Sequence, residues 1–390
     1  MLAIRSQFLN HFNYAPSLAV KSPGRINLIG EHTDYNHGFV LPAAIDKYIE
    51  VAIGKRTDGA IHMVALDLGQ TIILPIHHLA PHATPWVNYL IGVVHQVLEK
   101  TNTKDDLIKG VDICIQGNIP SGAGLSSSAA VECAVIFALN ELYQLQLTKM
   151  EMALMAQKAE HEFAGVKCGL MDMFASLHGQ KNKVIFLDCA SLDYAYYPLE
   201  LKDYSIVLFD TQIKHALASS EYNTRRLECE QGLKMIQEKY PAVKIFRDIN
   251  TEQVEDCLGS NKVLTGVKIY QRCKYVVEEI ERVQLAVKDL TAGDMEAFGK
   301  KMFATHEGLS KLYDVSCPEL DFLVEAVKQN EHVIGARMMG GGFGGCTINI
   351  IKNSELDLIS KELAAAYLKK YQKPLVVYPI SIEEGTHLLA

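Results

Sequence analysis

The stretch PSGAGLSSSAA, residues 120–130, separates two segments with different hydrophobic periods. Before it, VDICIQ (residues 111–116) alternates apolar and polar positions, which is typical of a β-strand. After it, apolar residues recur at helical spacing through SAAVECAVIFALNELY (residues 128–143). The sequence therefore predicts a strand, then a loop rich in glycine and serine, then a helix that begins near the serines.

Such a loop has the chemistry of a phosphate site. Backbone N–H groups at the start of a helix, together with the helix dipole, favour an anion. Serine hydroxyls can bind phosphate oxygens or Mg²⁺. The loop lacks the Gly-Lys-Ser/Thr ending of the common phosphate loop. A tight turn with serine N-caps is the alternative, although three serines after Gly122 and Gly124 exceed what capping needs. The segment alone leaves both interpretations open.

A second motif, GRINLIGEHTDYNHG at residues 24–38, is dense in polar side chains. Within six residues it holds Glu31, His32, Asp34 and Asn36. Each hydroxyl of a polyhydroxylated ligand needs a donor or an acceptor, so the cluster suits such a ligand. A metal site that adds His37 is the alternative, and it ranks lower because adjacent Glu and His do not share a face of a regular element. For Thr33 and Asn36 a polar turn is the competing interpretation.

The third motif, MGGGFGG at residues 339–345, places five glycines in seven positions. Glycine is retained where φ is positive or where another group approaches the backbone closely. A flexible linker is the alternative. Apolar residues on both sides, such as Met338 and Ile348, favour a position inside the fold instead.

The composition is that of a globular protein, with 48% hydrophobic and 22% charged residues. A chain of 390 residues suggests two domains. A net charge of −8 argues against nucleic acid as a partner, because phosphate backbones need clustered Lys and Arg.

The nine cysteines are scattered and form no CxxC pair, so neither a disulfide framework nor a zinc ribbon fits, and we expect a reducing cytoplasm. The start is too polar for a signal peptide, and no apolar run approaches the ~18 residues that a bilayer requires. We therefore expect no membrane partner.

Strand and helix patterns intermix in both halves of the chain. Strands are expected in YIEVAIG (48–54), KVIFLD (183–188), YSIVLFD (204–210), CTINII (346–351) and LVVYPISI (375–382). Thr148 and Glu151 have capping-box spacing at the start of a helix, and residues 224–330 are mainly helical. We expect an α+β protein with domains at 1–195 and 196–390, the boundary being weakly marked.

Together the three motifs resemble those of the GHMP kinases, and within that group the galactokinases. Further matches are CGLMDMFAS from Cys168 and EYNTRR from Glu221, so the resemblance spreads over nearly the whole chain, from about Gly24 to Cys346. It implies the two-domain GHMP kinase fold, with an N-terminal domain like domain 2 of ribosomal protein S5 and the active site between the domains.

The resemblance also implies the ligands. ATP phosphates would be wrapped by Gly122, Ala123, Gly124, Leu125, Ser126, Ser127 and Ser128. No lysine is required in this loop, because the positive charge would come from an arginine and from Mg²⁺ held by Ser128 and Glu160. Trp86 and Tyr89 match the family's segment near adenine, although buried aromatic residues mostly serve the core.

By the same resemblance, Asp172 is the catalytic base and Arg25 its partner. The sugar would be bound by Glu31, His32, Thr33, Asp34, Gly169 and Tyr222. The implied reaction transfers the γ-phosphoryl of ATP to O1 of α-D-galactose, giving α-D-galactose 1-phosphate and ADP, the first committed step of galactose metabolism (the Leloir pathway). We expect a monomer.

One position departs from the family pattern. After the catalytic Asp the family usually has Gln, whereas this chain has Met173. The change removes an amide near the expected site and puts the local hydrogen-bond network in question. Two alternatives for the function stay open: a kinase for another sugar such as N-acetylgalactosamine, and a non-catalytic sensor that binds galactose and ATP. The intact serine loop, Arg25 and Asp172 favour an enzyme.

Overall fold

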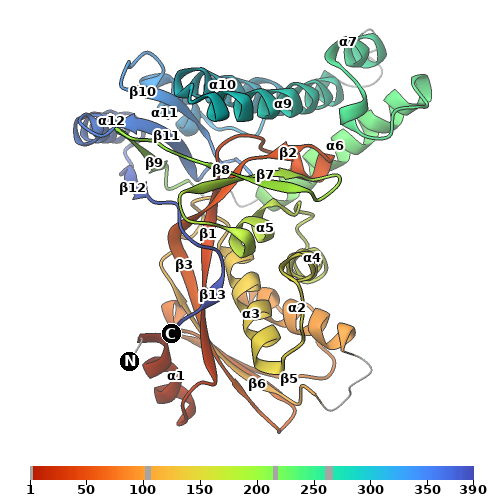
Figure 1. The fold of residues 1–390 in the computed structure, drawn as a ribbon, viewed down its shortest axis with the longest axis vertical. Helices are drawn as coiled ribbons and strands as arrows, with labels where there is room; N and C mark the ends of the chain where they lie inside the picture. The colour runs from red at the N-terminus through yellow and green to blue at the C-terminus, as the bar shows by residue number, and fades with distance from the viewer. Residues whose placement is uncertain (1–2, 102–106, 214–217, 260–266) are drawn as a thin grey trace.

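Strands form three β-sheets in residues 3–101, 107–213, 218–259 and 267–390, which the computed structural model describes. Figure 1 shows one sheet at each end of the molecule and a small sheet between them. Helices cover the sheets, so the expected α+β class is confirmed.

The largest sheet has the strand order β13-β1-β3-β6-β4-β5, and only β4 and β6 pair in parallel. Its strands are β1 (Leu18–Asn27), β3 (Pro42–Lys55), β4 (Ala60–Ala65), β5 (Gln70–Pro75), β6 (Val111–Gly117) and β13 (His387–Leu388). Side chains alternate across it: Val20 packs toward the main helical layer, whereas Ala19 packs toward α1 on the other face.

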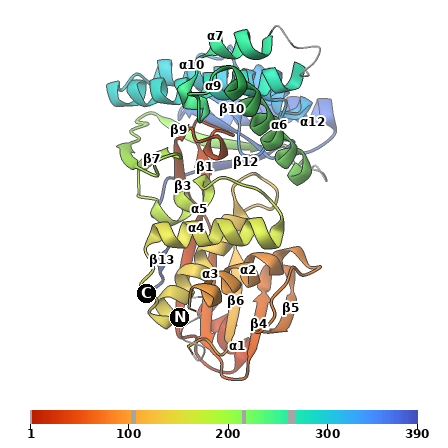
Figure 2. The same cartoon turned by 90° about the vertical axis from the view of Figure 1, so that its right-hand side faces the viewer.

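A layer of helices covers one face of this sheet (Figure 2). It consists of α2 (Pro85–Lys100), α3 (Ser127–Tyr143), α4 (Lys149–Ala159) and α5 (Met171–His178), with α1 (Ala3–Phe12) on the opposite face. The predicted loop of residues 120–130 leads into one of them, α3. The capping box of α4 is confirmed, because Thr148 accepts a hydrogen bond from the Glu151 N–H and the Glu151 side chain accepts one from the Thr148 N–H.

A second sheet has the order β10-β11-β9-β12. Its strands are β9 (Tyr204–Asp210), β10 (Val333–Met338), β11 (Cys346–Lys352) and β12 (Val376–Ile380). Ile206 and Leu208 face a core with α9 (Val267–Ala292) and α10 (Met295–Gly308). Val207 and Phe209 face α11 (Pro318–Val327) and α12 (Leu356–Tyr371). The expected strands are confirmed, and so is the mainly helical character of the described residues between 224 and 330; residues 260–266 lie outside them.

The third sheet, β2-β7-β8, lies between the other two (Figure 1). Its strands are β2 (Phe39–Val40), β7 (Lys183–Asp188) and β8 (Tyr194–Pro198). Val184 belongs to the core that contains α9, whereas Ile185 belongs to the core that contains α3. This sheet therefore joins the two main cores. The other elements of the described residues are α6 (Ala218–Lys239), α7 (Thr251–Val254), the 3₁₀ turns Asp34–Asn36, Leu66–Leu68 and Phe246–Asp248, and the π turns Glu160–Ala164, Glu255–Gly259 and Leu309–Tyr313.

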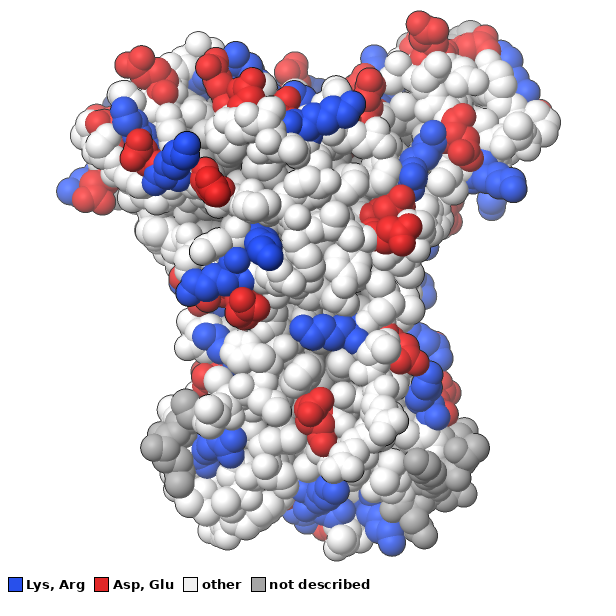
Figure 3. Space-filling model, in the orientation of Figure 1, with Lys and Arg blue, Asp and Glu red and all other residues white. Residues whose placement is uncertain are grey.

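The division of the chain at residues 195 and 196 stays a prediction. This position falls inside β8, and β13 near the C-terminus pairs with β1. On the face drawn in Figure 3, acidic and basic side chains are interspersed. No helix in the described ranges combines the length and the apolar character needed to span a membrane.

Candidate active site

Arg25 in β1 and Asp172 in the first turn of α5 form a bidentate ion pair. Arg25 Nε donates to Asp172 Oδ1 at 2.7 Å, and Nη2 donates to Oδ2 at 2.9 Å. The third guanidinium nitrogen, Nη1, donates to the carbonyl of Gly124 at 2.7 Å. The arginine side chain is 4% exposed and the aspartate side chain 24% exposed. A pair of this geometry fixes the plane of the carboxylate while leaving one edge of it open.

The glycine- and serine-rich segment is a loop between β6 and α3. Gly122 and Gly124 have φ values of +81° and +77°. Ala123 and Leu125 are buried in the core, whereas Gly122 and Ser127 are exposed. Two apolar side chains thus anchor the loop while its glycine backbone and the start of α3 face outward. This is an arrangement that binds anions well.

Ser128 and Glu160 lie together beside this loop. The Ser128 side chain hydrogen-bonds the carboxylate of Glu160, which is 7% exposed. Burial, and then the charge of Asp172, raises the pKa of Glu160 to about 7. A hydroxyl and a carboxylate are hard oxygen ligands, so these two residues fit a divalent cation such as Mg²⁺.

A further carboxyl group, Glu132, lies one helical turn after Ser128 in α3, and the sequence analysis missed it. The side chain is fully buried, and no nitrogen or hydroxyl of the described residues donates to its oxygens. Burial, followed by the charges of Glu160 and Asp172, raises the pKa of Glu132 well above the usual range. Burial therefore favours the protonated form of Glu132, which can share a hydrogen bond with Glu160.

The polar cluster of the second motif borders a pocket of about 120 Å³ that also contains the ion pair. Its walls include Arg25, Glu31, His32, Asp34, Glu160, Asp172, Tyr222 and Gly340. Asp34 is 8% exposed, and burial followed by the charge of Asp172 raises its pKa to about 7. Gly169 lies against Asp34, because a Cβ at residue 169 would stand 1.9 Å from Asp34 Oδ2. The structure thus brings Glu31, His32, Asp34, Gly169 and Tyr222 together.

His32 is held in a rare backbone conformation with φ of +63°. Its Nδ1 is 2.8 Å from the hydroxyl of Tyr35, and its ring lies 5.3 Å from the ring of Tyr222. Burial, and then the charge of Arg225, lowers the pKa of His32 to about 3, so the imidazole is neutral. Its buried Nε2 has no hydrogen bond of good geometry among the described residues, although the backbone of Gly341 is close enough to raise the pKa of the ring.

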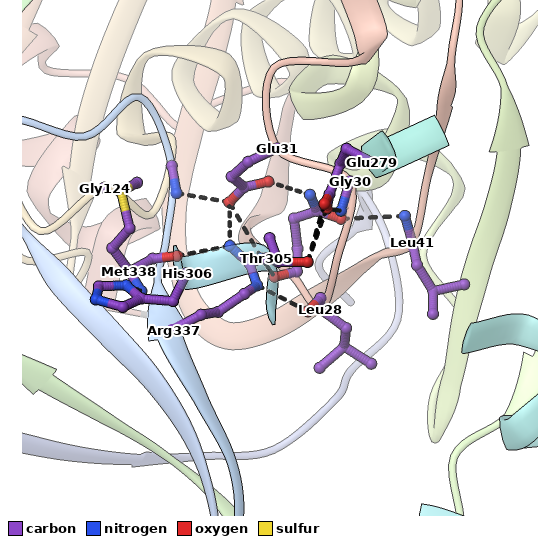
Figure 4. A network of polar contacts seen from close by, with 12 residues as sticks. Leu28, Gly30, Glu31, Leu41, Gly124, Glu279, Thr305, His306, Arg337 and Met338 are labelled. Atoms are coloured by element: carbon purple, nitrogen blue, oxygen red, sulfur yellow. Dashed lines mark hydrogen bonds and ion pairs between the residues drawn. The ribbon is translucent and has the colours of Figure 1, made fainter. Parts of the chain in front are cut away.

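Glu31 is the centre of the network in Figure 4. Its Oε1 accepts from Arg337 at 3.2 Å and from the N–H of Gly340 at 2.7 Å, and Oε2 accepts from Asn27. Gly340 has φ of +80°, and a Cβ there would lie 3.1 Å from the carbonyl oxygen of Gly124. The third motif is therefore inside the fold, in contact with both the polar cluster that contains Glu31 and the glycine- and serine-rich loop that contains Gly124.

A second buried carboxylate anchors the same segment. Glu279 in α9 accepts from the N–H of Gly30 at 2.9 Å and from the hydroxyl of Thr305 at 3.0 Å (Figure 4). It also pairs with Arg282. Gly30, the residue before Glu31, is thus held by Glu279 in α9, which is itself bonded to Thr305 in α10. Two elements from the second half of the chain hold the polar turn in place.

Thr33 differs from the expectation for it. Its side chain is fully buried, it does not line the pocket, and its hydroxyl lies within hydrogen-bond distance of the carbonyls of Gly30 (2.9 Å) and Phe39 (2.7 Å). These contacts stabilise the turn, so the polar-turn interpretation holds for Thr33. Met173 likewise points into the core with no exposed surface, away from the pocket beside Asp172.

The two aromatic residues expected near adenine lie in α2. Trp86 Nε1 donates to Gln70 at 2.6 Å, and burial followed by the charge of Glu160 raises the pKa of Tyr89 to about 12. Both pack against the core beneath α2, and neither is among the residues that line the pocket. Their role at adenine stays a prediction.

Family comparisons agree with this geometry. The family described as "GHMP kinases N terminal domain" matches residues 88–180, and "GHMP kinases C terminal" matches residues 286–369. "Galactokinase galactose-binding signature" matches residues 6–55, which contain the polar cluster. The class of protein is thus the GHMP kinases, with kinase matches in both halves of the chain.

Relatives that match over nearly the full length identify the family within the GHMP kinases. The galactokinase of Thermotoga maritima is 40% identical over 94% of this chain and 99% of its own, and that of Roseiflexus sp. is 36% identical over 98% and 95%. The crystal structure of Lactococcus lactis galactokinase complexed with galactose matches with a TM-score of 0.92 and 32% identity, covering 99% of each chain. The chain belongs to the galactokinase family of GHMP kinases, and its activity is that of an ATP-dependent sugar kinase.

Proposed function

We propose that this chain transfers the γ-phosphoryl group of ATP to O1 of α-D-galactose, giving α-D-galactose 1-phosphate and ADP. One observation carries the proposal. Arg25 joins the proposed base to the proposed phosphate loop, because the same guanidinium bonds Asp172 through two nitrogens and the carbonyl of Gly124 through the third. The relative solved with galactose bound supports the choice of sugar.

The proposed chemistry is an in-line phosphoryl transfer. Asp172 accepts the proton of the O1 hydroxyl as O1 attacks the γ-phosphorus, and the bond from that phosphorus to the bridging oxygen of ADP breaks. Arg25 orients the carboxylate, and its positive charge opposes the negative charge that develops on the transferring group. Both roles use the bidentate geometry of the pair.

Ser128 and Glu160 would hold Mg²⁺, and residues 122–128 would wrap the phosphates of ATP. The support is the contact between the Ser128 hydroxyl and the buried Glu160 carboxylate, an oxygen donor set at the start of α3. When bound, the cation neutralises charge on the phosphate oxygens. The protein would supply two ligands, and phosphate oxygens and water the others.

Sugar hydroxyls would be bound by Glu31, His32, Asp34 and Tyr222, with Gly169 contributing backbone. The positions of His32 and Asp34 on the pocket wall support these roles. Leaving a buried protein donor or acceptor without its sugar hydroxyl costs about 1–3 kcal/mol of binding free energy. Such a wall would therefore bind galactose in preference to glucose, which differs only at C4.

We also infer that the enzyme works in the cytoplasm as a monomer, without a nucleic acid or membrane partner. Its nine cysteines are free thiols, which suits a reducing compartment. The net charge of −8 disfavours a polyanion.

The test combines sugar affinity with turnover on the full chain. ADP release is measured with galactose, glucose and N-acetylgalactosamine, and galactose affinity by calorimetry, for the wild type, Asp172→Asn and the exposed control Asp203→Asn. We expect galactose to be used far better than glucose. Asp172→Asn should bind galactose within roughly tenfold of the wild type. Its kcat should fall by ~10²–10⁴-fold through loss of general-base catalysis.

Three outcomes would oppose the proposal. A wild type that binds galactose and ATP without forming galactose 1-phosphate is a sensor. Equal kcat/KM for galactose and glucose removes the assigned specificity. A normal rate in Asp172→Asn leaves the chain a kinase but takes Asp172 out of the mechanism.

A further inference from the structure

We propose that Ser126 is a positioning residue for the base Asp172 rather than a phosphate ligand. This proposal rests on the function above, in which Asp172 takes the proton of the sugar hydroxyl. The resemblance alone places Ser126 with the rest of the phosphate loop, so the assignment comes from the local geometry of this residue.

The backbone of Ser126 is strained. It is the N-cap of α3, yet its φ and ψ are +57° and +54°, in the left-handed region that residues with a side chain rarely adopt. Such strain persists only where surrounding contacts hold it, and it gathers at functional sites. Here the strained residue stands next to Leu125, whose side chain is anchored in the core.

The side chain of Ser126 does not cap its helix. A serine at this position usually accepts a hydrogen bond from an N–H in the first turn, as Thr148 does at α4. Ser126 makes no such bond. Its hydroxyl instead donates to Oδ2 of Asp172. The left-handed backbone therefore directs the hydroxyl to the carboxylate at the expense of the cap.

Ser126 and Arg25 together hold the carboxylate of Asp172. Among the described residues, Oδ2 accepts from Ser126 Oγ and from Arg25 Nη2, whereas Oδ1 accepts from Arg25 Nε alone. A carboxylate oxygen accepts about two hydrogen bonds, so Oδ2 is fully used and Oδ1 retains capacity. Oδ1 is thus the atom that receives the proton from O1, and Ser126 keeps Oδ2 from taking its place.

The three serines of the loop then have separate tasks. Ser126 bonds the base, Ser127 is exposed at the start of α3, and Ser128 bonds Glu160. This division explains why the segment needs more serines than a helix cap does. It also predicts that neighbouring serine substitutions affect different kinetic constants.

The experiment measures kcat and the KM of ATP for Ser126→Ala, Ser126→Gly and Ser127→Ala, with melting temperatures. Glycine tolerates positive φ, so Ser126→Gly relieves the strain while also removing the hydroxyl. We expect both Ser126 variants to lose about tenfold in kcat, while the KM of ATP changes by less than about threefold. Ser126→Gly should be at least as stable as Ser126→Ala. Ser127→Ala should mainly raise the KM of ATP.

A double-mutant cycle decides whether the effect passes through Asp172. In an Asp172→Asn background, Ser126→Ala should lower kcat by less than about twofold, because the carboxylate it positions is already gone. Full additivity would overturn the proposal, and so would a Ser126→Gly enzyme with wild-type kcat. A rise in the KM of ATP with unchanged kcat would overturn the proposal and indicate that Ser126 binds the ATP phosphates. If Asp172→Asn itself keeps the wild-type rate, the base assignment and the Ser126 proposal fall together.

Discussion

The guanidinium of Arg337 in β10 lies 3.2 Å from the carboxylate of Glu31, and both side chains are excluded from solvent. Arg337 also donates to the carbonyls of Leu28 at 2.8 Å and Met338 at 2.6 Å. A buried ion pair gives little net stability, because desolvation opposes the attraction. The pair instead places a fixed carboxylate in the wall of the sugar pocket.

Replacing Arg337 by Met should therefore weaken the binding of galactose more than the binding of ATP. Glu31 would remain buried without its cation, which costs about 3–5 kcal/mol of unfolding free energy. We expect galactose affinity to fall roughly tenfold, or ~1.4 kcal/mol, through the misplaced carboxylate. Calorimetry with each ligand and urea unfolding give the two quantities.

A stability-matched control for Arg337→Met is Val97→Ala in α2. The Val97 side chain is fully buried in the core between the largest sheet and its helical layer, a different core from the one near Arg337. That variant should lose stability and retain its affinity for galactose. Equal losses of galactose and ATP affinity in Arg337→Met would show a general loosening of the fold and contradict the positioning role.

The sequence predicted what depends on local pattern. The strand, loop and helix around residues 120–130 and the capping box at Thr148 follow from periodicity and spacing alone. The Arg25–Asp172 pairing came from the family resemblance, since no local rule brings together two residues 147 positions apart.

Arg337 and Ser126 show why the rest was not predicted. Arg337 sits in a strand among apolar residues, and its partner Glu31 is 306 positions away, so a single sequence contains no signal for the contact. Ser126 is one of three serines, and neither its left-handed backbone nor its bond to Asp172, 46 positions away, has a local signal in the sequence. For Thr33 the structure shows contacts within the turn, so its expected contact with the sugar stays a prediction.

Asp34 should make stability depend on pH. Burial and the charge of Asp172 raise its pKa to about 7 from the ordinary value of 3.8. Between these values the folded state binds more protons than the unfolded state, so the free energy of unfolding falls as pH rises. Asp34→Asn removes this dependence. Without ligands, we expect it to be more stable than the wild type by about 2–4 kcal/mol at pH 8, from ~1.4 kcal/mol per pK unit.

The Asp34 measurement is a series of urea titrations from pH 5 to pH 8. The difference between Asp34→Asn and the wild type should be smaller at pH 5 than at pH 8 by about 2–3 kcal/mol, because the folded carboxyl is protonated at pH 5. It should stop changing only below about pH 4, where the unfolded carboxyl is protonated too. The exposed control Asp193→Asn should show no such trend. A difference that is constant over the pH range would mean that Asp34 is ionised throughout.

Glu160→Ala should raise the Mg²⁺ concentration needed for half-maximal activity by about tenfold, because one of two proposed protein ligands is lost. Mn²⁺ binding to the enzyme–nucleotide complex, followed by electron paramagnetic resonance, gives a reading independent of turnover. The control is Glu162→Ala, an exposed carboxylate in the same π turn whose side chain bonds Gln96 at 2.6 Å. Equal Mn²⁺ affinity in the two variants would return Glu160 to a structural role.

Met173 gives the last test, because it stands where the family usually has Gln. Its side chain is fully buried in the core below α5, and Cys133 Sγ donates to its backbone carbonyl at 3.5 Å. An amide placed in that core would lack partners, which costs about 1–3 kcal/mol. We therefore expect Met173→Gln to be less stable by that amount, while kcat changes by less than about tenfold, or ~1.4 kcal/mol. Met173→Leu, which conserves volume, should cost less than about 1.5 kcal/mol. A larger change in kcat at unchanged stability would show that residue 173 reaches Asp172 after all, and that the missing amide belongs to the active site.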